Sequence, residues 1–182
     1  MGHTLPLLNI TLGYFLDGHC YPGPLQGGEA ACGRMALGPL GLLSQLETWL
    51  GLPSETVPGG LRIAQCLRAA RAILAKDSTV FYAKALVTAP WACAQRLLAM
   101  RDALVLSGWQ GGHPEDGGKR LKDLAALSQA LPKAPDLPAR LVTIIDVIQL
   151  FGLVHHLNIE LIEPRETWPQ CWKRLFSVLD SQ

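Results

Sequence analysis

The stretch Leu7–Asp17, LLNITLGYFLD, decides the fold class because it is the clearest strand pattern in the chain. Its larger apolar residues Ile10, Leu12, Tyr14 and Leu16 recur at every second position. That spacing is typical of a strand that buries one face. The sequence therefore predicts a β-strand near the start of the chain.

Most of the chain after this strand is predicted to be helical. Apolar residues recur at helical spacing in the segments 40–50, 61–76, 91–106, 119–131, 139–155 and about 169–179. The run Thr79–Val87 fits either a helix or an extended segment, and Asn158–Ile162 has the composition of a buried strand. Two apolar strands around a helical block predict a predominantly helical α/β fold with a parallel sheet. An essentially helical fold with a small β element is the alternative, since two strands alone make a weak sheet.

Composition narrows the class of protein. The chain has 182 residues, of which 49% are hydrophobic and 17% charged, so it can bury a core and is not a disordered chain. Its formal net charge is only +1. Binding to nucleic acid would therefore need a local basic patch and would be weakened by salt.

The cysteines and the N-terminal segment predict a cytoplasmic protein without a membrane anchor. No CxxC pair occurs among the five scattered cysteines, Cys20, Cys32, Cys66, Cys93 and Cys171. This pattern argues against a disulfide framework and against a thiolate zinc site. Met1–Leu16 is apolar, but it lacks a basic start and a cleavage motif and is too short to span a membrane.

The segment Gly33–Gly38 has the GxxxxG spacing of a phosphate-binding loop between a strand and a helix. A working loop of this kind needs a lysine and then a Ser or Thr that binds magnesium. Pro39 and Leu40 stand at those two positions and supply neither an amine nor a hydroxyl. We expect a plain Gly-rich turn into a helix, or a degenerate phosphate loop, and in either case no nucleotide hydrolysis and no cofactor.

Arg101 is predicted to form a structural ion pair. It projects into an apolar arc of the helix 91–106, where an unpaired charge would be costly. Asp102 points elsewhere on an ideal helix, so Glu47, Asp146 and Glu160 are the candidate partners. Contact with a ligand or with DNA is the alternative role for this arginine.

The remaining polar residues predict no catalytic or metal site. His155 and His156 are adjacent and diverge on a helix, so they do not converge on one ion. The densest basic cluster is Lys119, Arg120 and Lys122, which reads as a solvated helix start or as a contact to the DNA backbone. Trp168 and Trp172 share a helix face and are expected to lie in the core.

Several short segments together resemble a known family. They are LGPLGLL at 37–43, LETWLGLP at 46–53, Phe81-Tyr82, APWA at 89–92, MRDAL at 100–104, SGW at 107–109 and IELIEP at 159–164. In this order they resemble the opening of PD-(D/E)XK nuclease family proteins and inactivated superfamily I helicases, which are similar to the AddB/RexB subunit of helicase–nucleases.

The resemblance implies a degenerate RecA-like strand–helix element, without a phosphate loop, and a helical subdomain. We expect the first element at 1–60, the helical subdomain at 61–156, and a returning strand and helix at 157–182. The resemblance further implies a noncatalytic scaffold in a bacterial DNA-repair helicase–nuclease, with a natural chain that continues beyond Gln182. Its partners would be the remaining domains of the parent protein, DNA and a motor subunit. A helical protein-interaction domain without a nucleic-acid role is the alternative.

Overall fold

The computed structural model describes residues 7–17, 33–53, 57–112, 117–133, 135–153 and 155–181. Within them the chain forms, in order, β1 (Leu8–Leu12), β2 (Arg34–Leu37), α1 (Pro39–Leu50), α2 (Gly59–Leu74), α3 (Ala83–Thr88), α4 (Pro90–Leu106), α5 (Lys119–Ala130), α6 (Leu137–Phe151), β3 (Leu157–Leu161), a 3-10 turn (Arg165–Thr167) and α7 (Gln170–Leu179). The prediction of a predominantly helical α/β protein is confirmed. The ambiguous run 79–87 contains all but the last residue of the short helix α3.

The sheet has three parallel strands in the order β2-β1-β3, so β1 is central. Ile10 of β1 lies opposite Met35 of β2 on one side and Ile159 of β3 on the other. The sequence predicted only two of these strands. Residues 34–37, which we expected in a Gly-rich turn, instead pair with residues 9–12, and that part of the prediction is wrong.

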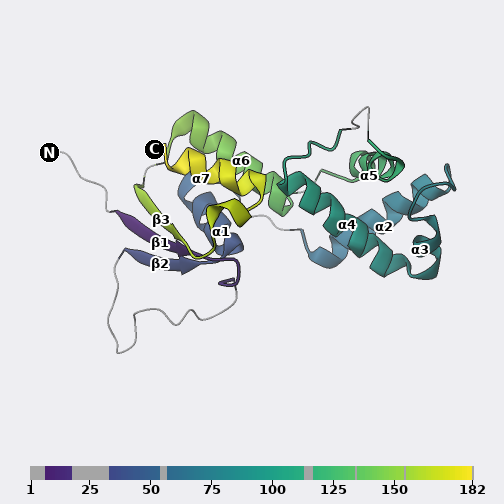
Figure 1. The fold of residues 1–182 in the computed structure, drawn as a ribbon, viewed down its shortest axis with the longest axis horizontal. Coiled ribbons are helices and arrows are strands. Elements are labelled where there is room, and N and C mark those ends of the chain that lie inside the picture. Colours follow the sequence, from purple (N-terminus) through teal and green to yellow (C-terminus); the bar gives the residue numbers. More distant parts are fainter. Residues whose placement is uncertain are drawn as a thin grey trace. The chain divides into compact units, whose positions relative to one another are not determined.

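The two faces of the sheet differ in polarity, which explains the two-residue period of β1. Ile10 and Leu12 are buried on one face. On the other face, Asn9 accepts a hydrogen bond from the side-chain amide of Asn158, at 2.9 Å. Figure 1 shows α1, α6 and α7 to one side of the strands. The apolar face of the sheet and the apolar sides of these helices make up one core.

Two compact units divide the chain. We call residues 1–54 together with 140–182 the sheet unit, and residues 55–139 the helical unit. The predicted helical subdomain, 61–156, included all of α6, whereas most of α6 belongs to the sheet unit. The physical reason is its buried stripe of Leu141, Ile144, Ile145 and Ile148, which completes the core that the sheet begins.

Each unit has its own hydrophobic core. In the sheet unit Trp168 and Trp172 are only 1% and 2% exposed, so their predicted core positions are confirmed. In the helical unit α2 packs on α4, and Leu97 and Leu127 are among the buried residues. No helix within the described residues combines the length and apolar character that crossing a membrane would require.

Candidate functional site

The N-terminus of α1 is the position where a phosphate-binding loop would hold its ligand. The helix begins with Pro39, one residue before the predicted segment 40–50, and Gly51 ends it in the left-handed conformation. The first amide groups of a helix have no partner within it and attract an anion. Here the carboxylate of Asp17 supplies the anion: it accepts hydrogen bonds from the N–H groups of Leu40, at 2.8 Å, and Gly41, at 2.9 Å.

Glycine is required where Asp17 approaches this helix. A Cβ atom on Gly38 would overlap both the backbone and the carboxylate of Asp17. On Gly41 it would lie 3.5 Å from a carboxylate oxygen, an ordinary contact, so the requirement concerns Gly38. Gly38 in the GxxxxG pattern is therefore explained by an internal carboxylate. Gly33 adopts a positive φ of 78° just before β2 and does not line the start of the helix.

The gap between the ends of β1 and β3 is closed by a second carboxylate. Ligands of open parallel sheets bind at the carboxyl ends of the strands, where the connections change direction. At this edge Ile162 packs so closely on Gly13 that a Cβ there would lie 2.7 Å from its Cδ1 atom. Glu163 accepts the N–H of Tyr14 with both carboxylate oxygens, at 3.1 and 3.2 Å.

Tyr14 is held over the core by this arrangement. Its ring stacks on Trp168 with centroids 4.0 Å apart. Burial, and then the charge of Glu163, raise the pKa of the Tyr14 hydroxyl. The phenol therefore stays protonated at neutral pH and serves to pack this edge of the sheet.

Together these contacts fill the carboxyl edge with the chain's own groups. Asp17 accepts hydrogen bonds from the amide groups at the start of α1, and Glu163 accepts the hydrogen bond of the Tyr14 amide. A nucleotide phosphate placed there would face two carboxylates and no lysine. The geometry fits a structural edge better than a nucleotide site.

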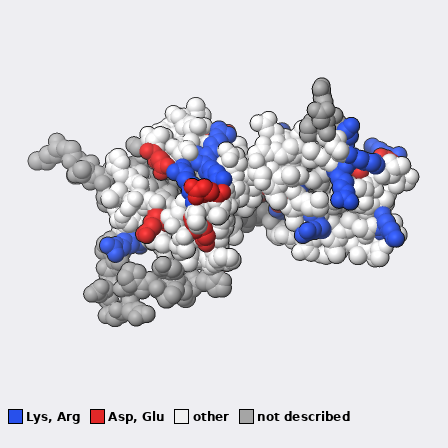
Figure 2. Space-filling view, in the orientation of Figure 1, with Lys and Arg blue, Asp and Glu red and all other residues white. Residues whose placement is uncertain are grey.

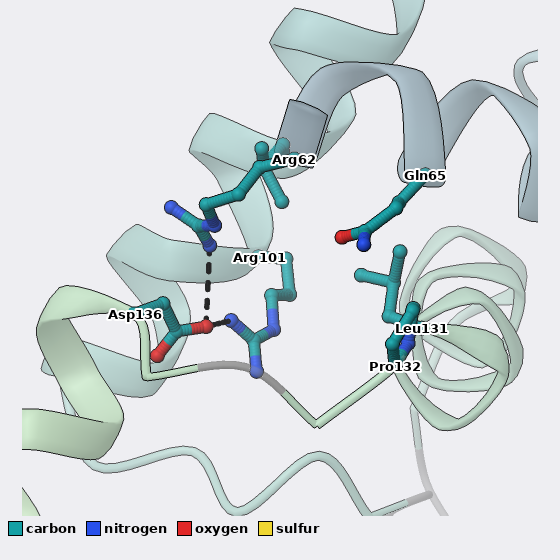
Figure 3. A pocket seen from close by; sticks show the side chains of 7 residues that line it. Arg62, Gln65, Arg101, Leu131, Pro132 and Asp136 are labelled. Carbon is teal, nitrogen blue, oxygen red and sulfur yellow. Dashed lines mark hydrogen bonds and ion pairs between the residues drawn. The ribbon is translucent and has the colours of Figure 1, made fainter. Parts of the chain in front are cut away.

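Arg101 forms ion pairs, but not with the partners that we expected. Its guanidinium donates to Asp136 and, at 2.8 Å, to Asp102. The sequence predicted that Asp102 points elsewhere, and that prediction is wrong. Arg62 donates to the same two carboxylates, at 2.9 Å to Asp102. Its bond to Asp136, at 3.2 Å, is drawn in Figure 3. These hydrogen bonds and charges raise the pKa of Arg101 despite its partial burial.

The three carboxylates proposed as partners of Arg101 all lie in the sheet unit. Glu47 forms a bidentate pair with Arg140, at 2.6 and 2.8 Å, and both side chains are buried. Asp146 lies 3.5 Å from Arg174 on the surface, and Glu160 is exposed on β3. The buried Arg140–Glu47 pair was missed because Arg140 falls at the very start of a predicted helix, where the apolar stripe is not yet evident.

Of the predicted basic cluster Lys119, Arg120 and Lys122, one residue already has an acidic partner. Lys119 lies 3.2 Å from Asp123, whose other oxygen accepts the N–H of Phe81 at 2.8 Å. Arg120 and Lys122 are exposed, and neither has an ion pair within the described part of the chain. They remain available for a phosphate contact.

The described residues Cys66, Cys93 and His155 do not form an activated site. Burial raises the pKa of Cys66 to about 11 and also raises that of Cys93, so neither is a ready thiolate. His155 packs against Trp49, with ring centroids 4.9 Å apart. Among the described residues, no group of three or more His, Cys, Asp or Glu side chains could hold a metal ion.

Replacing Asp17 by alanine should lower the free energy of unfolding by about 1 kcal/mol, because two amide groups of α1 lose their acceptor. Chemical denaturation of Asp17→Ala measures this loss. Asp146→Ala is the control, since its surface pair with Arg174 should contribute little. Equal losses in the two variants would show that Asp17 does not hold the start of α1.

Arg101→Leu should lower the free energy of unfolding by about 2 kcal/mol, since Asp102 and Asp136 each lose a charged donor. Thermal and urea unfolding measure the effect. Arg174→Leu provides the matched control, because that side chain is 52% exposed and its pair is on the surface. A melting temperature of Arg101→Leu equal to that of the unmodified protein would refute the structural role.

Comparisons with known proteins identify no relative. No family model matches the chain, and neither a curated protein nor a solved structure matches it. We therefore infer function from the contacts and charges of the molecule itself.

Proposed function

We propose that this chain is a noncatalytic, helicase-like scaffold domain of a bacterial DNA-repair helicase–nuclease subunit. The observation that carries the proposal is the carboxylate of Asp17 at the start of α1. A parallel sheet followed by a helix at its carboxyl edge is the layout in which a motor domain binds nucleotide phosphates. An internal anion at that position supports a degenerate RecA-like element, in which the strand–helix arrangement is retained and the nucleotide site is lost.

The charges of the helical unit support a role in contacting DNA. Residues 55–139 contain eleven Lys and Arg against seven Asp and Glu, which gives a formal net charge of +4. Three of those carboxylates, Asp102, Asp123 and Asp136, are already paired with cations. Figure 2 shows several Lys and Arg side chains and little Asp or Glu on the visible face of α2 to α5.

The cations that are free to meet a phosphate lie on several elements of this unit. The exposed residues with no ion pair among those described are Arg68, Arg71, Lys76, Lys84, Arg96, Arg120, Lys122 and Lys133. Such side chains bind the DNA backbone without reading its sequence. In this proposal the cytoplasmic parent protein and a separate motor subunit supply the nuclease and the ATP-driven movement.

A helical protein-interaction domain is the second candidate, and one observation favours it. Val87 and Trp91, at the junction of α3 and α4, are 75% and 49% exposed. An exposed tryptophan beside an exposed valine is a common feature of protein contact surfaces. DNA binding distinguishes the two candidates, because DNA would bind through the exposed cations, whereas a protein partner would bind through the apolar side chains Val87 and Trp91.

The protein should neither bind nor hydrolyse ATP with magnesium, since Asp17 occupies the anion position and no lysine reaches it. Thermal unfolding with and without Mg-ATP, and phosphate release, measure the two properties. A melting temperature raised by Mg-ATP would contradict the scaffold proposal. Turnover above the level of a buffer control would contradict it as well.

Double-stranded DNA should bind weakly, with a dissociation constant on the order of 1–100 μM at physiological salt. Replacing Arg68, Arg71 and Lys122 together by glutamine should reduce the slope of log affinity against log salt by roughly 2–3. Fluorescence anisotropy across a salt series measures both quantities.

The matched control carries Arg34→Gln and Arg174→Gln, two exposed cations of the sheet unit. Its salt slope should equal that of the unmodified protein. If both variants bind DNA as the unmodified protein does, or if none of the three proteins binds, the protein-interaction candidate replaces the scaffold proposal.

A further inference from the structure

Asp136 lies in the proline-rich segment that joins α5 to α6, and its side chain points toward two arginines. Figure 3 shows it facing Arg62 from α2 and Arg101 from α4, beside a small pocket that Gln65 and Pro132 also line. All of these residues belong to the helical unit. One carboxylate thus meets two guanidinium groups that come from different helices.

The two oxygens of Asp136 have different roles. Oδ2 accepts from Arg62, at 3.2 Å, and from Arg101. Oδ1 accepts the N–H of Ala139 in the first turn of α6, at 2.9 Å. The same carboxylate therefore balances part of the charge of the arginine pair, with Asp102 balancing the rest, and it caps the start of α6.

The surroundings of the arginines fit a tetrahedral oxyanion. Paired guanidinium groups are the side chains that bind carboxylate and phosphate oxygens most specifically. The side chains of Arg62 and Arg101 are each 19% exposed, whereas that of Asp136 is only 7% exposed. The small pocket beside them, with the amide of Gln65 in its wall, reaches both guanidinium groups, and a phosphate group would enter it only as Asp136 withdraws.

We propose that Arg62 and Arg101 form an oxyanion site whose resident anion is Asp136, and that an external phosphate group competes with Asp136 for it. When phosphate takes the site, Asp136 withdraws and the first turn of α6 loses its cap. This inference goes beyond the scaffold function and does not depend on it, because it concerns a pair of arginines that the exposed cations do not include.

Charge decides which external anions can compete. A tethered carboxylate acts at a high local concentration, in the millimolar range or above, but it carries a single charge. A phosphate group carries nearly two and offers three acceptor oxygens. Inorganic pyrophosphate is therefore a suitable probe, and sodium chloride of equal ionic strength is its control.

Removing the charge of Asp136 should open the site to the probe. Asp136→Asn keeps the shape of the side chain, and we expect it to bind pyrophosphate at least about tenfold more tightly than the unmodified protein, a difference of about 1.4 kcal/mol. Adding Arg101→Gln to this variant should abolish the gain. Calorimetry and pyrophosphate-dependent melting measure the change.

Two further variants keep the test decisive. Asp102→Asn removes the other carboxylate that pairs with both arginines, without touching the cap of α6, and it should also bind pyrophosphate more tightly than the unmodified protein, even if Asp136→Asn does not fold. Asp146→Asn makes the same charge change on the surface of the sheet unit and should show none. Equal pyrophosphate affinity in Asp102→Asn, Asp146→Asn and the unmodified protein would overturn the site.

Hydrogen exchange tests whether phosphate competes with Asp136 in the unmodified protein. Amide hydrogen exchange at Leu137, Ala139 and Arg140 should be faster in pyrophosphate than in sodium chloride, because the N–H of Ala139 loses its acceptor. Equal exchange in the two salts would overturn the competition. Faster exchange with a single-stranded oligonucleotide would assign the phosphate to a nucleic-acid backbone, and a response to pyrophosphate alone would assign it to a small phosphate compound.

Discussion

The sheet unit depends on satisfying the amide groups at the carboxyl edge of its parallel strands. Unpaired N–H groups at a helix start are costly when they are removed from water, and they attract negative charge. In this chain the acceptors are its own carboxylates: Asp17 accepts at the start of α1, and Glu163 accepts from the amide of Tyr14. The need for glycine at position 38 and the stacking of Tyr14 on Trp168 result from those contacts. The edge that could hold a ligand is therefore part of the fold's own framework.

In each unit, an arginine that is buried or partly buried forms its ion pairs with carboxylates of the same unit. Arg140 pairs with Glu47 inside the sheet unit, and Arg101 pairs with Asp102 and Asp136 inside the helical unit. Neither arrangement is strong evidence for added stability, because removing charges from water offsets much of the attraction. Another packing register of these helices would leave a charge unpaired in a partly buried place, which is costly.

The sequence predicted the elements whose signals are local. The helices with a clear apolar period appear close to their expected positions, as α1 does between Pro39 and Gly51. The strand β2 was missed because four residues between glycines carry no period, and its pairing with β1 arises only in the folded sheet. The partners of Arg101 were missed for a related reason. Asp136 lies in a proline-rich segment outside any helical pattern, and only the fold brings it to α2 and α4.

The net charge of the whole chain is nearly neutral, but the two units have opposite formal charges, which the sequence analysis did not predict. The helical unit carries a formal charge of +4, and the sheet unit, with five Lys and Arg against eight Asp and Glu, carries −3. At physiological salt, charges act over only about 8 Å, so a partner responds to the unit that it touches and not to the total. A polyanion would meet attraction on the helical unit and repulsion on the sheet unit. The internal carboxylates at the sheet edge, Asp17 and Glu163, add to that repulsion within the sheet unit.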